Sequence, residues 1–272
     1  MGISLRDICG ASIDPPERVC DSACTVSSAG SEPGAHHDHD KRGIPMSTET
    51  AYSTVVIEGP GRNLLNPENM AKLEADLRAA GADPNTSAIV LTGAGDVFCG
   101  GLDVPAIKAG ADPIPFYSAL VDILKLVPTL PKPVVAVVNG DAVATGGALV
   151  AASDYAVSAP DAMIGSYEVS VGVWPIVAQV PLIKRLGARA AIQNLASGEP
   201  FTAEGALAVG LVNEVVEKGR LLDAAGDWVA KAARAGAAMA TGRPSVYELE
   251  QLDYDDALDE AFKRLAQAYA NN

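Results

Sequence analysis

Two uninterrupted apolar segments that each end in glycine limit the possible folds of this chain more than any other feature. They are AIVLTG at residues 88–93 and PVVAVVNG at residues 133–140. A strand that is apolar on both faces needs cover on both faces, and the helices that connect parallel strands provide this cover. Because helical periods separate the two segments, the sequence predicts an α/β fold built on a parallel sheet.

Shorter elements extend this pattern along the chain. Further strands are predicted at residues 54–57, 154–157 and 163–165. A helix is predicted to begin at Pro67, with Asn66 as its N-cap. After residue 176 the sequence is typical of helices, and a last helix from Tyr254 carries apolar residues at helical spacing. That apolar stripe has to pack on the body of the protein or on another subunit.

The first 50 residues differ from the rest of the chain. They contain Pro15-Pro16 and a serine-rich stretch, and they sustain no period of 2 or 3.6 residues. We therefore expect a disordered tail over residues 1–50, a core over residues 51–200 and a helical region over residues 201–272.

All three histidines of the protein lie in this tail. His36, His37 and His39 lie beside Asp38 and Asp40, and such a set could chelate a metal ion. Zinc needs ligands that a scaffold holds in a fixed geometry, and nothing in the tail predicts such a scaffold. We therefore interpret the set as a polar stretch and expect no metal site.

Charge and composition exclude several classes of partner. The formal net charge of −14 should repel a phosphate backbone, so no nucleic acid is expected. No apolar run approaches the roughly 20 residues that span a bilayer, so no membrane partner is expected. Three of the four cysteines precede residue 25 and only Cys99 lies in the body, which excludes a disulfide framework. This cysteine usage fits a cytoplasmic location.

Three glycine-containing segments carry the chemistry. They are FCGGLDV at residues 98–104, ATGG at 144–147, and GSYE at 165–168 with VGVWP at 171–175. Enolate formation next to a thioester puts negative charge on the thioester oxygen, and two converging backbone N–H groups can hold that charge. Glycines let the backbone approach a ligand closely. A helix that begins at Thr145 would aim free N–H groups at the same oxygen.

In this order and spacing, the three segments resemble the crotonase superfamily, also called the enoyl-CoA hydratase/isomerase family. The resemblance runs from about Tyr52 to the C-terminus and includes RNLL at 62–65, SGEPFTAEGAL at 197–207 and GLVNEVV at 210–216. It implies an α/β fold with a crotonase-like ββα spiral core, followed by a helical C-terminal region that makes the contacts of a homotrimer or hexamer. It also implies an acyl-CoA or other acyl-thioester substrate, with coenzyme A as part of the substrate and no tightly bound cofactor.

The resemblance further implies roles for individual residues. The two oxyanion-hole donors correspond to the N–H groups of Leu102 and Thr145. The family usually has glycine where Thr145 stands, and threonine keeps the N–H group but adds a branched side chain to the pocket. The residues that match substrate-binding positions are Arg62, Leu64, Gly100, Gly101, Asp103, Gly146 and Trp174.

The acid–base residues decide the reaction. Hydratases of the family use two glutamates, and the matching positions hold Ala148 and Glu168. Alanine cannot carry a proton, so the chain is similar to the single-glutamate enoyl-CoA isomerases, in which one carboxylate moves a proton from C2 to C4. Asp103 is either a second acid or the structural aspartate that the family commonly has at this place.

Three functions remain open on these grounds. The first is a double-bond isomerase with Glu168 as the proton shuttle. The second is hydration, or other crotonase-type chemistry, with Glu168 alone, and the third is a non-catalytic homologue that binds acyl thioesters. No histidine follows residue 39, which excludes a Ser-His-Asp arrangement. Without a histidine to activate it, Cys99 is expected to be a small buried cysteine.

Overall fold

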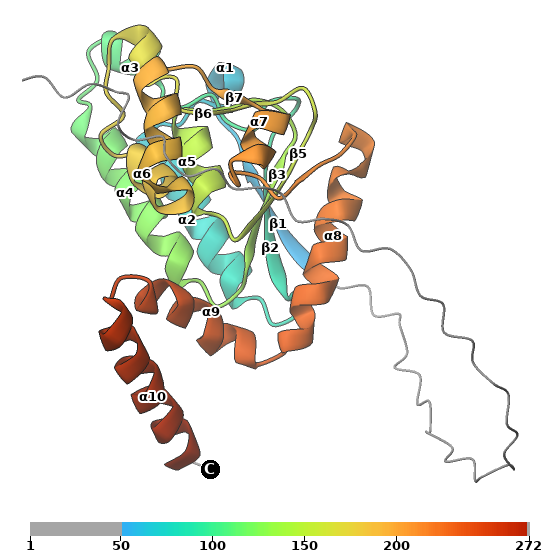
Figure 1. The fold of residues 1–272 in the computed structure, drawn as a ribbon. Coiled ribbons are helices and arrows are strands. Elements are labelled where there is room, and N and C mark those ends of the chain that lie inside the picture. The colour runs from blue at the N-terminus through green and yellow to red at the C-terminus, as the bar shows by residue number, and fades with distance from the viewer. Residues whose placement is uncertain (1–50, 271–272) are drawn as a thin grey trace, which may run out of the picture. The chain divides into compact units, whose positions relative to one another are not determined.

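The computed structural model describes residues 51–270 and shows an α/β fold with two sheets and flanking helices (Figure 1). The predicted tail and its histidines lie outside the described residues. No helix between residues 51 and 270 combines the length and the apolar character that crossing a membrane would need.

The larger sheet contains five parallel strands in the order β1-β2-β3-β5-β8. Their bounds are β1 (Tyr52–Ile57), β2 (Ala88–Gly93), β3 (Val134–Val138), β5 (Tyr155–Ser158) and β8 (Glu214–Val215). The register pairs Val55 with Leu91 and Leu91 with Ala136. The two apolar segments of the sequence, β2 and β3, are thus interior strands, as expected for strands that are apolar on both faces.

The smaller sheet has three short strands in the order β4-β6-β7. Their bounds are β4 (Ala142–Val143), β6 (Met163–Gly165) and β7 (Phe201–Thr202). The β4 and β6 strands are parallel, whereas β6 and β7 are antiparallel. Single parallel bridges from Leu65 to Leu102 and from Cys99 to Ala142 extend this layer toward the start of the chain.

Each turn of the core passes through a strand of the larger sheet, a segment of the smaller layer and a helix. The helices that close the four turns are α2 (Pro67–Ala82), α4 (Ile114–Leu126), α5 (Thr145–Ala152) and α6 (Gln179–Ser197). In the first two turns the middle segment is only the bridge at Leu65 or the stretch with Cys99 and Leu102. This path confirms the predicted ββα spiral. The capping box of Asn66 and Asn69 confirms the predicted start of α2.

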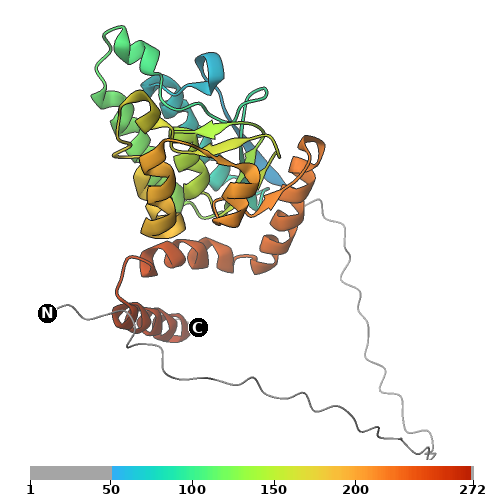
Figure 2. The same ribbon diagram turned by 45° about the horizontal axis from the view of Figure 1, so that its top comes forward.

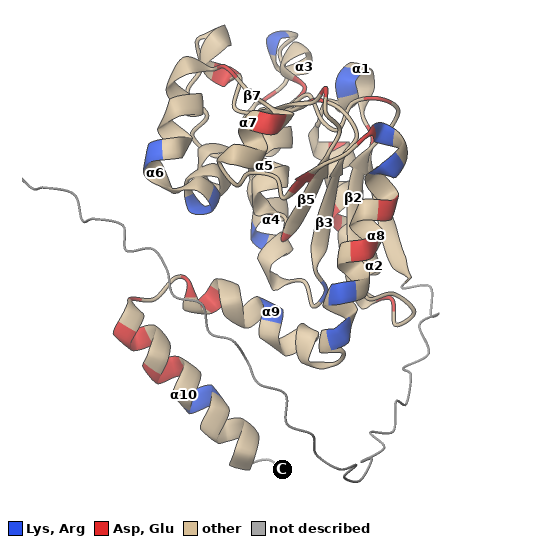
Figure 3. Ribbon diagram, turned by 45° about the vertical axis from the view of Figure 1, so that its right-hand side comes forward, with Lys and Arg blue, Asp and Glu red and all other residues tan. Residues whose placement is uncertain are grey.

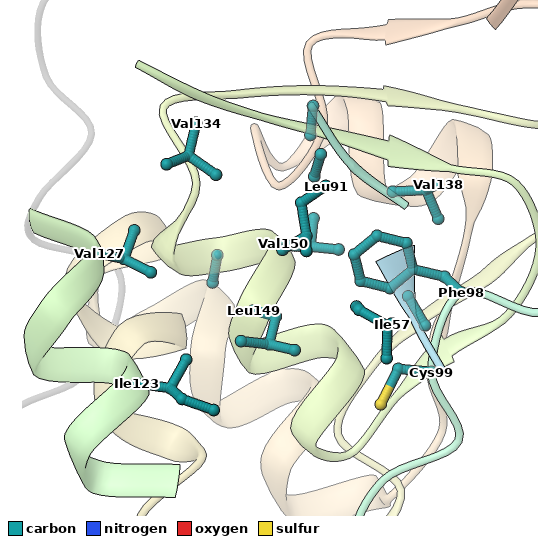
Figure 4. Close-up of a cluster of buried hydrophobic side chains, with 14 of the residues drawn as sticks. Ile57, Leu91, Phe98, Cys99, Ile123, Val127, Val134, Val138, Leu149 and Val150 are labelled. Atoms are coloured by element: carbon teal, nitrogen blue, oxygen red, sulfur yellow. The ribbon is translucent and has the colours of Figure 1, made fainter. Parts of the chain in front are cut away.

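The larger sheet is buried on both faces, which explains the uninterrupted apolar strands. Leu91 belongs to a core cluster with residues of α2, α4 and α5, while its neighbour Val90 packs in a second cluster with α8 (Leu221–Ala232). Figure 4 shows side chains of the first cluster, with Leu91 of β2 near Val150 of α5. Full burial of one such side chain stabilises the fold by about 1.5–3 kcal/mol.

The region after residue 200 contains more than the helices that the sequence predicts. Besides β7 and β8 it holds α7 (Ala203–Ala208), α8, α9 (Ala238–Leu249) and α10 (Tyr254–Ala270), of which the last three follow one another in Figure 2. The β8 strand completes the larger sheet, since Asn213 just before it exchanges hydrogen bonds with the backbone of Ala156. Strands of two residues are too short to show a period in the sequence. The remaining short helices include α1 (Pro60–Asn63) and α3 (Val104–Lys108).

The first turn of α5 lies directly against two other backbone segments. A Cβ atom at Gly146 would lie 2.4 Å from the carbonyl oxygen of Cys99, and one at Gly147 would lie 2.7 Å from the Cα atom of Gly165. Only glycine fits at these two positions, because a side chain would force the segments apart. Gly146 therefore sets the distance from α5 to the segment with Cys99, and Gly147 sets the distance to the loop that leads to Glu168.

A buried ion pair attaches α9 to the end of the sheet where β3 and β5 begin. Arg243 of α9 donates to the carboxylate of Asp154, with a distance of 2.8 Å from Nε to Oδ2. Tyr247 donates to the other oxygen of Asp154 at 2.6 Å. Burial and the charge of Asp154 raise the pKa of Tyr247 to about 12. The Arg243 guanidinium also donates to the carbonyl oxygens of Val127, Pro128 and Leu130.

We predict that Gly147→Ala lowers the free energy of unfolding by about 1–3 kcal/mol, the usual cost of overpacking. Its Cβ atom would meet the backbone of Gly165, which cannot move away as a flexible side chain could. Gly226→Ala in α8 is the matched control, because nothing lies within 4 Å of its Cβ position; it should be neutral or stabilising by about 0.5–1 kcal/mol. Urea unfolding measures both variants, and equal stability of the two would contradict the close contact.

We also predict that Arg243→Gln lowers the free energy of unfolding by about 3 kcal/mol, since it leaves a buried carboxylate without its cation. Arg264→Gln is the control. Arg264 pairs with Glu248 and Glu260 on the surface of α9 and α10, where such pairs contribute at most about 1 kcal/mol. Urea unfolding gives both free energies of unfolding, provided that their dependence on urea concentration is the same in the two variants. If the Arg243→Gln protein were as stable as the Arg264→Gln protein, Arg243 would not anchor α9.

Candidate active site

The first predicted donor lies in the stretch after β2. The N–H of Leu65 donates to the carbonyl oxygen of Gly101 at 2.9 Å, and the N–H of Asp103 donates to the carbonyl oxygen of Leu65 at 2.8 Å. Both bonds point toward Leu65, so the N–H of Leu102, which lies between them, points to the opposite side. It has no acceptor within residues 51–270.

The second predicted donor is the first residue of α5. The N–H of Ala144 donates to the carbonyl oxygen of Gly165 at 2.8 Å, and the N–H of Ala148 donates to Ala144. The N–H groups of Thr145, Gly146 and Gly147 precede the first bond inside the helix, so they have no helical acceptor. The start of α5 thus presents free N–H groups and the positive end of the helix dipole.

The two predicted donors lie in adjacent segments. A Cβ atom at Gly101 would be 2.9 Å from the Cβ atom of Ala144 and 3.9 Å from the backbone nitrogen of Thr145. Gly101 adopts φ +108°, a conformation that favours glycine. The structure therefore brings Leu102 and Thr145 close together. Glycine at position 101 leaves the space between them open, because a side chain there would fill it.

Ala144 adopts a strained backbone conformation immediately before Thr145. Its φ of 54° and ψ of −117° are unusual for a residue with a Cβ atom, and such strain costs about 1–3 kcal/mol. The bond from Ala144 to Gly165 and the bond from Ala148 to Ala144 hold this conformation. This conformation turns the chain sharply from β4 into α5 and so fixes the direction of the Thr145 N–H.

Glu168 lies half-buried at the start of the turn that follows β6, and one of its two carboxylate oxygens is held. Its Oε2 atom accepts hydrogen bonds from the Ser166 hydroxyl at 2.7 Å and from the N–H of Tyr167 at 2.9 Å. The Oε1 atom has no partner within the described part of the chain. One oxygen is thus fixed in place while the other remains available to accept a proton.

Two residues that the sequence analysis did not select support Glu168. Ser166 supplies the hydroxyl described above, and Asn194 of α6 is fully buried and brackets Ser166. Its side chain accepts from the N–H of Ser166 at 2.6 Å and donates to the carbonyl oxygen of Ser166 at 3.0 Å. An asparagine inside an apolar helical stripe, between Ala191 and Leu195, was the available signal.

Asp103 has a structural partner. Its side chain caps α3, with the N–H of Ala106 donating to Oδ1 at 3.1 Å. A cap of this kind stabilises a helix by about 1 kcal/mol. It corresponds to the structural role that the resemblance allows for Asp103. Gly146 lies at the site as well, packed against Cys99.

Arg62 and Leu64 lie beside the glycines of the first segment. The carbonyl oxygen of Arg62 accepts from the N–H of Gly100 at 2.9 Å, and a Cβ atom at Gly100 would be 3.3 Å from the Leu64 side chain. The guanidinium of Arg62 is exposed and donates to Asp141 at 2.5 Å. Asp141, which the sequence analysis did not select, also accepts from the N–H of Met163.

Trp174 is not joined to these residues by any contact that the structure records. Its indole N–H donates to the side chain of Gln179 at 3.0 Å, and the side chain is exposed. It belongs to the loop that connects Glu168 to α6.

Cys99 is fully buried, as predicted. Burial raises the pKa of its thiol to about 12, and the N–H of Gly101 opposes this shift only in part. Burial and the raised pKa both disfavour the thiolate, so Cys99 fits the small buried cysteine that the sequence predicts.

A large cavity lies away from all the predicted site residues. It has a volume of about 870 Å³ and mostly apolar walls. It adjoins Ala152 and Asp154 at the C-terminal end of α5, whereas Thr145 lies at the N-terminal end. Within residues 51–270, no group of three or more His, Cys, Asp or Glu side chains is arranged to hold a metal ion.

Known proteins share both the sequence pattern and the fold. A relative from Mycobacterium bovis, "Probable enoyl-CoA hydratase echA6", is 35% identical over 196 residues, which cover 70% of this chain and 76% of the relative. A Thermus thermophilus protein named provisionally as an enoyl-CoA hydratase is 37% identical over 60% of this chain and 67% of its own length.

Solved structures agree with these relatives. An enoyl-CoA hydratase from Mycobacterium smegmatis superposes with a TM-score of 0.74 at 30% identity, covering 79% of this chain and 86% of that chain. Human enoyl Coenzyme A hydratase domain-containing protein 3 superposes with a TM-score of 0.73 at 25% identity, covering 80% and 88%. The family model described as Enoyl-CoA hydratase/isomerase matches residues 48–251. The chain therefore belongs to the enoyl-CoA hydratase/isomerase family.

Proposed function

We propose that this protein is an enoyl-thioester double-bond isomerase in which Glu168 carries the proton. The observation that supports this most is the distribution of carboxylates around the two donors. The α5 helix has none, because Ala148 is fully buried where the hydratases of the family have a glutamate. Asp103 caps α3 and Asp141 pairs with Arg62. Glu168 pairs with no cation and caps no helix, and its Oε1 atom has no partner in the described chain.

The reaction follows from this arrangement. The free Oε1 of Glu168 takes a proton from C2 of a 3-enoyl thioester, and the electrons delocalise onto the thioester oxygen. The N–H groups of Leu102 and Thr145 donate to that oxygen, and the dipole of α5 adds to the stabilisation. Glu168 then returns the proton at C4, which moves the double bond into conjugation with the carbonyl. Ser166 and the N–H of Tyr167 keep the carboxylate oriented for both transfers.

Coenzyme A is the carrier that we propose for the acyl group. The net charge of −14 disfavours an anionic ligand in general, so its phosphates need a local cation. Arg62 is exposed beside Gly100 and is the side chain that we assign to this contact. Because its partner Asp141 is also partly exposed, the ion pair contributes little and can open toward a phosphate.

Hydration by Glu168 alone is the second candidate. The relatives in Thermus and Mycobacterium carry hydratase names, and that is the observation in its favour. A single carboxylate would then have to activate the water and supply the proton at C2. A non-catalytic thioester-binding protein is the third candidate, since Ala148 and Thr145 both depart from the family pattern.

We predict that Glu168→Gln abolishes conversion of a 3-enoyl-CoA to the 2-enoyl isomer while ligand binding persists. Glutamine keeps the shape of the side chain but cannot carry a proton. Loss of general base catalysis alone costs roughly 10²–10⁴-fold, and a residue that performs both transfers should reach the upper end. The loss should appear in kcat rather than KM, because the interaction belongs to the transition state.

Asp103→Asn is the control for this experiment, since asparagine also caps helices well and cannot act as an acid. It should leave turnover nearly unchanged. If Asp103→Asn stops the reaction and Glu168→Gln does not, the acid–base assignment is wrong. Assays of 2-enoyl-CoA hydration on the same samples separate the first two candidates, and binding without turnover of either substrate would favour the third.

We also propose that the protein forms a homotrimer or hexamer through its C-terminal helices. One face of α10 carries large apolar side chains that are exposed in the single chain, among them Tyr254 at 78% and Phe262 at 71%. The remaining members of this face are Leu258, Leu265 and Tyr269. An exposed apolar stripe of this length marks a contact surface. Figure 3 shows acidic residues in the first turns of α10. They lie off the apolar face, on the part of the helix that we expect to remain in water.

Phe262→Glu should therefore lower the molar mass in solution toward that of one 27.8 kDa chain. A charge placed in an apolar interface has no partner there and is costly to bury. Gln267→Glu adds the same charge to an exposed position on another side of α10 and should leave the mass unchanged. Light scattering coupled to size-exclusion chromatography measures both, and a parent protein that runs as a monomer would refute the proposal directly.

A further inference from the structure

The α5 helix offers a single polar side chain to the proposed active site. Its sequence is TGGALVAA, and residues 145–151 are all buried. Beyond its backbone N–H groups, anything that α5 contributes to polar chemistry has to come from the hydroxyl of Thr145. The family pattern has glycine at this position, so the hydroxyl is a departure that the two-donor mechanism leaves unused.

The Thr145 hydroxyl differs from the other buried hydroxyls of the described chain. Ser153 donates to the carbonyl oxygen of Leu149, Ser158 to that of Ala159, and Ser166 to Glu168. Thr145 is only 2% exposed, yet its hydroxyl has no hydrogen-bond partner within residues 51–270. The hydroxyl of Thr145 is therefore free to donate to a ligand, unlike those of the three serines.

The direction of this hydroxyl follows from the same comparison. Across residues 51–270, no fully buried side-chain oxygen or nitrogen lacks a partner. The small exposed part of Thr145 therefore includes its hydroxyl oxygen, so the hydroxyl faces open space rather than the core. The backbone nitrogen of the same residue lies 3.9 Å from the Cβ position of Gly101, which places Thr145 itself beside the gap at Leu102.

We propose that the Thr145 hydroxyl is a third hydrogen-bond donor to the thioester oxygen, beside the N–H groups of Leu102 and Thr145. In two of the three staggered χ1 rotamers a threonine hydroxyl lies gauche to its own backbone nitrogen. The N–H and O–H of one residue can then donate to one ligand oxygen.

The stabilisation grows as the reaction proceeds. A hydrogen bond to an oxyanion is roughly twice as strong as one to a neutral carbonyl. The hydroxyl therefore stabilises the dienolate more than the bound substrate and increases kcat. This inference rests on the proposed thioester chemistry, but the part it assigns to Thr145 holds for any reaction of this site that passes through an enolate.

Two variants isolate the hydroxyl. Thr145→Val keeps the branched shape and the N–H group but removes the O–H group, whereas Thr145→Ser keeps the O–H group and removes the methyl group. We expect Thr145→Val to lower kcat by about 10²-fold, the low end of the range for a single donor in an oxyanion hole, with little change in KM. Thr145→Ser should recover most of the kcat that Thr145→Val loses, and all three proteins should melt at the same temperature.

A spectroscopic readout separates this proposal from the proposed function. A conjugated 2,4-dienoyl-CoA absorbs at longer wavelength when hydrogen bonds polarise its carbonyl, so its difference spectrum on binding reports the donors without any turnover. We expect a red shift with the parent and with Thr145→Ser, and a smaller red shift with Thr145→Val.

Equal shifts and equal kcat for the parent and Thr145→Val would overturn the role of the hydroxyl and leave the two-donor site intact. Equal losses in Thr145→Val and Thr145→Ser would also overturn it, because they would assign the effect to packing. If the parent itself neither binds the dienoyl-CoA nor shifts its spectrum, the proposed thioester chemistry fails together with the third donor.

Discussion

The contact between the first turn of α5 and the backbones of Cys99 and Gly165 is the constraint on which the proposed site depends. No side chain separates these segments, because Gly146 and Gly147 leave room only for backbone atoms. This contact places the start of α5 beside the segment with Leu102 on one side and beside the loop with Glu168 on the other. Backbone atoms have few alternative positions, so the contact holds the donors and the carboxylate more rigidly than side-chain packing would.

Strain and buried polar groups maintain this arrangement. Ala144 keeps its unfavourable φ because bonds to Gly165 and Ala148 hold it from both sides. Asn194 brackets Ser166, which in turn holds one oxygen of Glu168. Each buried polar group in this chain of contacts has a partner, so its desolvation is compensated. At the other end of the sheet, the carboxylate of Asp154 likewise has partners, because Arg243 and Tyr247 both donate to it.

The polar groups that remain without partners distinguish the site from its surroundings. Those that we assign to the reaction are the N–H groups of Leu102 and Thr145, the hydroxyl of Thr145 and one oxygen of Glu168. Three of the four are donors, which suits a ligand oxygen that gains negative charge. The fourth is an acceptor, which suits a proton that leaves and returns. One available carboxylate and several donors are the basis on which we propose transfer of a proton along a carbon chain rather than activation of water between two carboxylates.

The sequence alone determined the parts of this protein that depend on local patterns. The apolar strands β2 and β3 and the cap at Asn66 could be predicted, because each is visible in a few adjacent residues. The roles of Ala148 and Glu168 are implied by the family resemblance and stay predictions. Only the tertiary structure decided which distant residues support them. Asn194 lies 28 positions from Ser166, and Arg243 lies 89 positions from Asp154. The unusual φ of Ala144 and the addition of β8 to the sheet also arise from such contacts. Such distant residues meet because the spiral brings separate turns of the chain together. Neither the hydrophobic period nor the spacing of residues in the sequence predicts which turns become neighbours.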